Sequence, residues 1–238
     1  MKKINLTAVI ILFSVTLFAQ KTEFRVQLNS GFFSFRGNGS SQSSHILCTN
    51  EQLSSGYTNN PYGSKMGSCI GVSGNLTRAS KHKFLYGTDI GFEIVRSKTD
   101  IQSVSTNSTS YSAIGETFLV NKFINLYPYL GYRLINKKTK LDFTGGLDVA
   151  FCLQSKEKGT AIAYNGTSGI LFNTSIDRKT INTDFRPRFQ IAASYKKMGM
   201  YAGYSLGLKN YLSDVLGFPK VYEAYSNYLR LGLTYQLH

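Results

Sequence analysis

Two groups of residues have types and spacings that could do chemistry. Asp89 and Glu93 lie four residues apart, so in an extended strand both carboxyl groups face the same side, as general acid–base catalysis requires. His45 follows a serine-rich stretch at 40–44, and a histidine beside serine hydroxyls could activate a nucleophile. No acidic residue is placed by its spacing to orient this histidine. A lipid-modifying enzyme is therefore an alternative that the sequence does not favour, and no catalytic residue is predicted.

The polar face that carries Asp89 and Glu93 has a simpler use. Other segments of the chain place arginines on the corresponding face, so carboxylate and guanidinium groups are expected to meet and pair in one interior. We predict a network of ion pairs in a lumen, formed by Arg25, Asp89, Glu93, Arg133, Asp142, Asp148, Arg186, Arg188 and Arg230.

No metal or cofactor is predicted. The cysteines, Cys48, Cys69 and Cys152, and the histidines at 45, 82 and 238 follow none of the spacings of a zinc site. An odd number of cysteines also encodes no disulfide framework. We expect the thiols to serve packing.

The composition excludes several classes of protein. The 238 residues include 27 Lys and Arg against 13 Asp and Glu, and 42% of them are hydrophobic. A disordered chain would have fewer apolar residues. Beyond the N-terminus no apolar run approaches the 18 or so residues of a membrane-spanning helix. Any membrane role must be performed by strands.

The N-terminus has the pattern of a secretory signal peptide. Lys2 and Lys3 precede an apolar run over 8–18, which closes at Ala19 before a polar stretch. We predict a signal peptide over 1–19 and a single exported domain over 20–238.

Apolar and polar residues alternate with a period of two in eight segments, which predicts eight β-strands. In the clearest case, Leu147, Val149 and Phe151 alternate with polar residues such as Asp148. The segments are 23–36, 65–77, 84–96, 117–135, 140–155, 184–195, 198–209 and 228–237.

The connections between these segments are alternately short and long. The short ones are 78–83, 136–139 and 196–197, and the long ones are 37–64, 97–112, 156–183 and 210–226. In an up-and-down arrangement all short turns lie at one end and all long loops at the other. An even strand number with this asymmetry is typical of an outer-membrane β-barrel.

Two barrel types are compatible with the alternation. In a soluble up-and-down barrel such as a lipocalin the apolar face points inward. Here the polar face mixes charges with glycines, as a narrow eight-strand interior requires, and the apolar face is long enough to cross hydrocarbon. We favour an apolar outer face.

The turn at 136–139 also predicts a register. Pairing Ile135 with Lys140 places Arg133 opposite Asp142 on the polar face. We therefore expect an Arg133–Asp142 contact.

The basic excess is concentrated in the short turns, at Arg78, Lys81, Lys83, Lys137, Lys138, Lys140, Lys196 and Lys197. These side chains either face anionic lipid headgroups or are simply solvated. Neither interpretation needs a nucleic-acid partner.

The runs YAGYSLGLKN at 201–210 and NYLRLGLTY at 227–235, together with the signal peptide and the eight segments, resemble the PorT-like and OmpA/OmpX-like outer-membrane barrel families. The resemblance is one of pattern and covers the mature chain. It implies an all-β, eight-stranded antiparallel up-and-down transmembrane β-barrel in a Gram-negative outer membrane, inserted by the barrel-assembly machinery. The chain ends at His238 instead of the usual terminal aromatic residue.

The long loops are rich in tyrosine, a good contact residue, which indicates either recognition of an unknown extracellular ligand or ordinary exposed loops. The residues are Tyr57, Tyr62, Tyr111, Tyr164, Tyr211, Tyr222 and Tyr225. We predict a monomer with outer-membrane lipids as partners and a structural or surface-interaction role. The alternatives are a small pore and a lipid A-modifying enzyme.

Overall fold

The structure, a computed structural model, describes residues 21–50, 55–106, 109–166, 168–213 and 221–237. This part of the chain is all-β, with eleven strands. Within these ranges no helix is long and apolar enough to cross a membrane. The predicted signal peptide lies outside the described residues.

The eleven strands vary widely in length. They are β1 (Lys21–Arg36), β2 (Ser43–Asn50), β3 (Ser55–Thr58), β4 (Lys65–Ala79), β5 (Phe84–Ser105), β6 (Ser110–Asn136), β7 (Thr139–Asn165), β8 (Ser168–Asp177), β9 (Thr183–Tyr195), β10 (Met198–Leu206) and β11 (Tyr225–Gln236).

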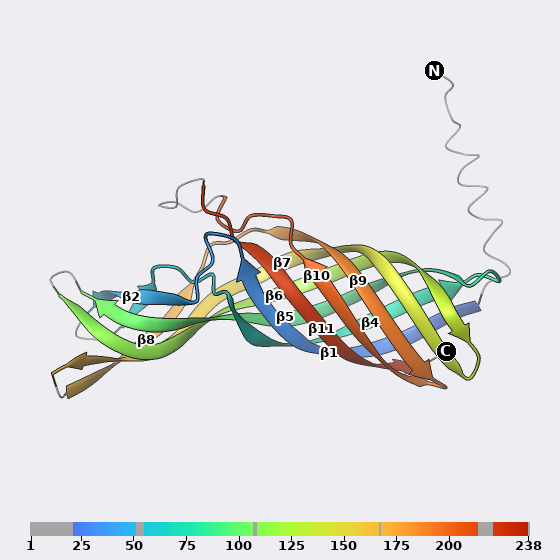
Figure 1. Ribbon diagram of the computed structural model, residues 1–238, viewed down its shortest axis with the longest axis horizontal. Helices are drawn as coiled ribbons and strands as arrows, with labels where there is room; N and C mark the ends of the chain where they lie inside the picture. Colours follow the sequence, from blue (N-terminus) through green and yellow to red (C-terminus); the bar gives the residue numbers. More distant parts are fainter. Residues whose placement is uncertain (1–20, 51–54, 107–108, 167, 214–220, 238) are drawn as a thin grey trace, which may run out of the picture.

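Eight of the strands pair in a closed cycle, which we call the eight-strand ring. The antiparallel pairings run β1–β4–β5–β6–β7–β9–β10–β11 and return from β11 to β1. These strands correspond to the eight predicted segments. The ring occupies the larger part of the molecule in Figure 1, and β11 ends near the short turns.

A second cycle continues from the first, and we call it the six-strand ring. Here β2 pairs in parallel with β5, β3 pairs with β2 and in parallel with β8, and β8 pairs with β7. The long strands β5, β6 and β7 run through both rings (Figure 1). The two rings therefore share three strands, and β2 and β8 join the six-strand ring by pairing with two of them.

The prediction of long loops at 37–64, 97–112 and 156–183 was wrong. Strands β2 and β3 lie in the first range, β7 and β8 fill most of the third, and only residues 106–109 separate β5 from β6. These stretches are rich in Ser, Thr and Asn, so their two faces differ little in polarity and the alternation is weak. Parallel pairings such as β2 with β5 also join segments that no local turn signal connects.

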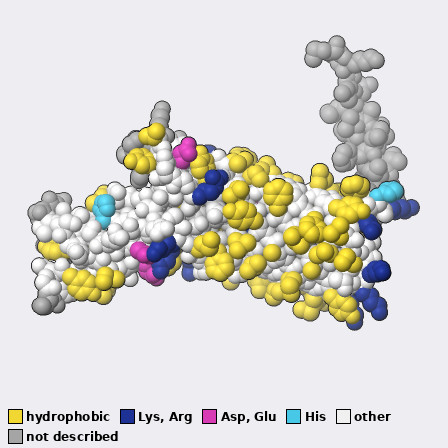
Figure 2. Space-filling model, viewed as in Figure 1, with side chains coloured by type: hydrophobic (Ala, Val, Ile, Leu, Met, Phe, Trp, Pro, Cys, Tyr) yellow, Lys and Arg dark blue, Asp and Glu magenta, His cyan; other side chains and the backbone are white. Residues whose placement is uncertain are grey.

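The eight-strand ring is apolar outside and polar inside. Leu130 on β6 is 72% exposed, whereas Arg230 on β11 is fully buried. Figure 2 shows the hydrophobic side chains as a broad zone over this ring, with Lys and Arg at the end where the short turns lie. This sidedness contradicts the lipocalin-like alternative and agrees with the predicted apolar outer face.

The six-strand ring differs from the eight-strand ring on both faces. Its interior contains an apolar cluster in which Ile46 and Val104 are fully buried, together with Ile101, Ala113, Ala161, Ala163 and Phe172. Polar side chains are buried in it as well, among them Glu157, which pairs with Arg178. The face seen in Figure 2 is mostly polar, although Ile114 and Leu171 are exposed on this ring. The apolar cluster is what the hydrophobic effect produces in a barrel surrounded by water.

An irregularity on β7 lies where the eight-strand ring passes into the six-strand ring. The register between β6 and β7 shifts where Phe123 pairs with Cys152 and Lys122 pairs with Gln154. As a result Leu153 and Gln154, predicted on opposite faces, are both exposed. A β-bulge of this kind redirects the side chains that follow it.

The core of the six-strand ring provides a first test. We expect Ile46→Ala to destabilise this ring by about 2–5 kcal/mol, because the residue is fully buried. Amide hydrogen exchange should then accelerate in β2 and β8 and stay unchanged in β10 and β11. Ile114→Ala, at a residue 72% exposed on the same ring, is the matched control. Equal effects of the two substitutions would contradict a packed core.

Candidate functional site: the filled interior of the eight-strand ring

All nine residues of the predicted network lie inside the eight-strand ring. Each is at most 6% exposed, although they come from six different strands, β1, β5, β6, β7, β9 and β11. Charged side chains buried to this degree are stable only when paired. The structure arranges them in layers along the ring.

The first layer lies at the short-turn end and is centred on Arg133. Its guanidinium donates to Asp142 Oδ1 at 2.7 Å and to Glu23 Oε1 at 2.9 Å, so one side chain of β6 joins β7 and β1. Arg25 pairs with Glu23 and lies 3.6 Å from Asp142. The predicted Arg133–Asp142 contact is confirmed. The predicted pairing of Ile135 with Lys140 was wrong, because a shift in register places Ile135 opposite Leu141.

The second layer is centred on Arg230. Arg230 Nε donates to Glu93 Oε1 at 2.9 Å, and its Nη2 donates to Asp148. Asn125 Nδ2 donates to Glu93 at 2.9 Å and to Asp148 at 3.1 Å. The guanidinium also lies over the ring of Tyr228, 3.9 Å from its centre. Two carboxylates that would repel each other are thus held together by shared donors.

Asp89 is held beside this layer by Arg188. Their closest atoms are 3.6 Å apart, and Asn75 donates to the same carboxylate. Arg188 lies over the ring of Tyr127 at 4.2 Å, a cation–π contact that adds to the pairing. Asp89 and Glu93 are therefore each engaged by an arginine, as expected of a structural network.

The third layer contains Asp184, which the sequence prediction missed. Asp184 Oδ2 accepts from Arg186 Nε at 2.7 Å, from the Tyr211 hydroxyl at 2.9 Å and from Ser226 Oγ at 2.6 Å. Glu23 in the first layer was missed as well, and both are fully buried. Each stands two residues before a predicted arginine, on the same face. Asp184 already lies on the polar face of the predicted segment 184–195 but was left out of the network, and extending the polar face of 23–36 by one step from Arg25 would have found Glu23.

An aromatic layer closes the interior on the side of the six-strand ring. Phe33, Phe35 and Tyr228 come from β1 and β11, and Tyr62 and Tyr211 come from the connections. Their rings meet edge to face, with centres 4.8 Å apart between Phe35 and Tyr211 and 5.2 Å apart between Phe35 and Tyr62.

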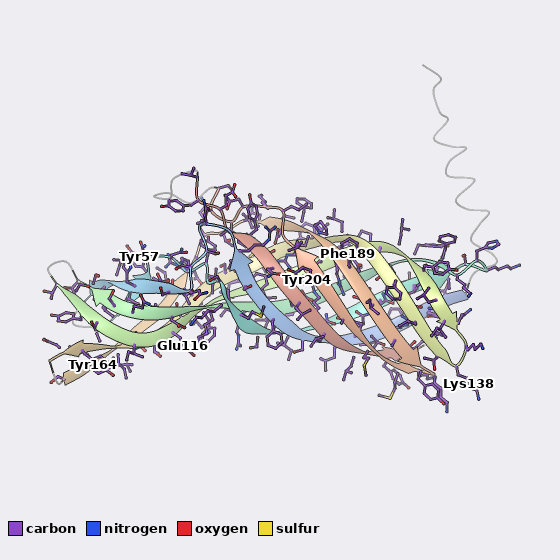
Figure 3. All side chains as sticks on the ribbon, viewed as in Figure 1. Tyr57, Glu116, Lys138, Tyr164, Phe189 and Tyr204 are labelled. Carbon is purple, nitrogen blue, oxygen red and sulfur yellow. The ribbon has the colours of Figure 1, made fainter. Side chains whose placement is uncertain are left out.

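Two tyrosines predicted in exposed loops belong to this layer instead. Tyr62 is 2% exposed and Tyr211 is 1% exposed. Burial raises the pKa of both phenols, so they remain neutral hydrogen-bond donors. The other five tyrosines of that prediction stay partly or fully exposed, among them Tyr57 and Tyr164 in Figure 3. The prediction that they lie in loops was wrong for four of them, because Tyr57, Tyr111, Tyr164 and Tyr225 belong to strands.

Side chains fill most of the interior. A void of about 10 Å³ remains in the first layer, bordered by Arg25, Asn75 and Thr144, which is room for about one water molecule. An eight-strand ring has an interior just wide enough for its own side chains. The charged layers therefore act as a plug.

The predicted basic turns lie at one end of the eight-strand ring, where Figure 3 shows Lys138. Lys81, Lys83, Lys137, Lys138, Lys196 and Lys197 are exposed, and Arg78 is half-buried. Lys83 and Lys196 have φ values of 67° and 52°, the left-handed conformation that tight hairpin turns require.

The prediction that Lys140 belongs with the exposed basic residues of the short turns was wrong. Its ammonium donates to Glu23 at 2.7 Å and to Gln236 at 3.0 Å, so it faces the mouth of the interior. Lys140 shares the inward face of β7 with Asp142, two residues away, which explains its direction.

The other candidate chemistry finds no support in the described part of the chain. His45 lies in β2, not in a loop, and no hydrogen bond joins it to a serine hydroxyl there. The same ranges hold no cluster of metal-ligating side chains. The three cysteines are free; Cys48 packs on the core of the six-strand ring, and Cys69 and Cys152 pack with the aromatic layer.

Comparison with known proteins finds distant structural likeness. No family model matches the chain, and no curated protein matches its sequence. The chain is similar to Neisserial surface protein A (NspA), with 11% identity and a TM-score of 0.39 over 90% of this chain and 98% of that one. It is also similar to Ail, the attachment invasion locus protein of Yersinia pestis, with 9% identity and a TM-score of 0.33 over 91% and 99%. A Pseudomonas aeruginosa FadL homologue gives 8% identity and a TM-score of 0.22 over 93% and 91%. No family is assigned on this likeness.

The second layer can be tested by removing its shared donor. We expect Arg230→Met to destabilise the protein by about 3–5 kcal/mol, because Glu93 and Asp148 remain buried without their partner. Adding Glu93→Gln and Asp148→Asn should recover much of this loss. The measurement is the urea midpoint at which the β-sheet circular dichroism signal of the purified protein is half lost. Arg78→Met is the control, and an Arg230→Met midpoint equal to that of the control would refute the pairing.

Proposed function

We propose that the chain forms an eight-stranded transmembrane β-barrel of the outer membrane, with a structural or surface-interaction role and no catalytic role. The observation that carries this proposal is the sidedness of the eight-strand ring, which is charged inside and apolar outside. In water this arrangement would expose an extended apolar wall, at a cost of about 25 cal/mol for each Å². In a bilayer the same wall is in its preferred solvent.

The length of the apolar wall supports a membrane-spanning position. On β5 the outward apolar residues extend from Phe84 to Ile94, and the next outward residue is Arg96. This stretch of eleven residues agrees with the 9–11 tilted residues that a transmembrane strand needs. On β11 the outward apolar residues run from Leu229 to Leu237.

The orientation follows from the two ends of the barrel. We place the short turns on the periplasmic side, where Lys81, Lys137 and Lys197 meet anionic headgroups, and the six-strand ring outside the cell. The proposal includes export through the signal peptide over 1–19, insertion by the barrel-assembly machinery in a Gram-negative cell, and a monomeric state. In pattern the domain over 20–238 is similar to the OmpA/OmpX-like and PorT-like barrels.

The filled interior supports a role outside the barrel instead of transport. Ion-paired layers and the aromatic layer lie across the path that a solute would take. The six-strand ring stands above the proposed membrane as a packed platform, on which Tyr164 is 44% exposed. We therefore place the function on the outer surfaces of the molecule.

The membrane setting predicts a difference between two exposed isoleucines. Ile90 is 59% exposed on the apolar wall, and Ile114 is 72% exposed on the six-strand ring. Ile90→Arg should cost about 2–4 kcal/mol, as an arginine facing lipid does, whereas Ile114→Arg should stay within about 0.5 kcal/mol. Refolding into lipid vesicles at graded urea concentrations measures both. Similar tolerance at the two sites would show that the wall faces water.

Closure of the interior predicts an electrical result. The purified protein in planar bilayers should give no steady unitary conductance, because its lumen is filled by paired charges. Insertion is verified in the same preparation by protection of the strands from protease. A steady, ion-selective current from the unaltered protein would favour the small-pore alternative.

A further inference from the structure

A second group of cations lies on the outer face where the two rings meet. It consists of the basic residues Lys65, Arg96, Lys98, Lys122, Lys156 and Lys158 and the acidic residues Asp100, Glu116 and Asp177, on β4 to β8. We call it the junction patch. The sequence prediction placed the basic excess at the opposite end of the barrel and missed this group.

The strand register brings the cations of the junction patch together. Arg96 pairs with Val120, and Val120 pairs with Lys156, so two cations flank one apolar side chain. In the next row Lys98 and Lys158 flank Phe118 in the same way. Neighbouring strands are about 4.8 Å apart, so the two flanking residues of a row lie about 10 Å apart at their backbones. Flexible side chains can converge across this distance.

Part of the patch is neutralised and part is not. Lys65 pairs with Asp100 and Lys98 pairs with Glu116. Within the described ranges, no carboxylate forms an ion pair with Arg96, Lys122, Lys156 or Lys158. Asp177 lies opposite Lys156 in the register but forms no ion pair with it. Four neighbouring positive charges therefore face outward.

The position of these cations coincides with the end of the apolar wall. On β5 the outward residue that follows Ile94 is Arg96, and on β6 the outward residue next to Ile124 is Lys122. On both strands the apolar wall is therefore followed directly by a cation. Figure 2 shows basic and acidic side chains side by side at this junction, and Figure 3 places Glu116 there. Elsewhere along the junction Arg36 is already engaged by the Gly207 carbonyl and the ring of Tyr225.

We propose that the junction patch binds the phosphate groups of a lipid headgroup in the outer leaflet, and specifically those of a bis-phosphorylated glycolipid. This inference rests on the proposed membrane position of the eight-strand ring. Charge complementarity supports it, because four unpaired cations exceed what one singly charged headgroup can neutralise. Arg96 supplies the planar donor fork that suits phosphate oxygens, and the lysines add point charges. Val120 and Phe118 give the patch an apolar floor between the cations.

The test measures lipid binding to the folded full-length protein in neutral detergent by native mass spectrometry. The probes are diphosphorylated lipid A, the same lipid with both phosphates removed, and phosphatidylglycerol. We expect the unaltered protein to retain the diphosphorylated lipid best. The variant Arg96→Gln/Lys122→Gln/Lys156→Gln/Lys158→Gln should bind it about tenfold more weakly or worse, because each basic side chain contributes to anionic lipid attraction.

A matched variant controls for total charge. Lys81→Gln/Lys137→Gln/Lys138→Gln/Lys197→Gln removes the same four charges at the other end of the barrel. Because these lysines are proposed to meet anionic headgroups of any kind, this variant should retain less phosphatidylglycerol while the preference for diphosphorylated lipid A stays in place. Heat-modifiable migration verifies that each protein is folded, and the double variant Arg96→Gln/Lys156→Gln replaces the fourfold variant if that fails to fold. Equal loss in the control, no loss in the patch variant, or equal retention of phosphatidylglycerol would overturn the proposal.

A separate measurement distinguishes this proposal from the one on which it rests. Flotation of the protein with lipid vesicles reports membrane insertion without any glycolipid. Insertion without binding of diphosphorylated lipid A refutes the junction patch alone. Failure of the unaltered protein to insert refutes the membrane position itself, and the junction patch with it.

Discussion

The structure depends on one constraint: a charge inside a narrow β-ring must find a partner across the ring. Arg133 on β6 joins carboxylates of β1 and β7, and Arg230 on β11 joins carboxylates of β5 and β7. Each guanidinium thereby connects strands that are not neighbours. Because an unpaired buried charge is costly, these contacts favour one register for all the strands involved. A slip of one residue would turn the arginines outward and the leucines inward.

The same three strands pass through two environments. Along β5, β6 and β7 the outward residues are apolar beside the charged interior and mostly polar beside the apolar cluster of the six-strand ring. The bulge near Leu153 lies close to this change. Under the proposed function the first part faces lipid and the second faces water. The charged side chains of the first part are thus kept away from lipid, and the apolar cluster of the second is kept away from water. The aromatic layer around Phe35 and Tyr211 separates the two interiors.

Positive charge on the outer surface is concentrated at the two ends of the apolar wall. The turn lysines lie beyond one end of the apolar wall, and the junction patch lies beyond the other. In the proposed setting both groups sit at headgroup level, where basic side chains hold a barrel at a fixed depth. The two groups differ in construction. The turn lysines project from separate hairpins, whereas Arg96, Lys122 and Lys156 are brought together by the register of three adjacent strands.

The sequence by itself determined the features that follow from alternation and local turns. The all-β class, the apolar outer face, the Arg133–Asp142 pairing and the nine buried charges could be predicted, because period-2 patterns fix which side chains share a face. Tertiary structure decided the rest. The partners of Arg230, the inward insertion of Tyr211 and the parallel pairings of β2 and β3 join segments far apart in the chain. No local pattern encodes such contacts, because the residues that meet are separated by long stretches of sequence and come together only in the folded molecule.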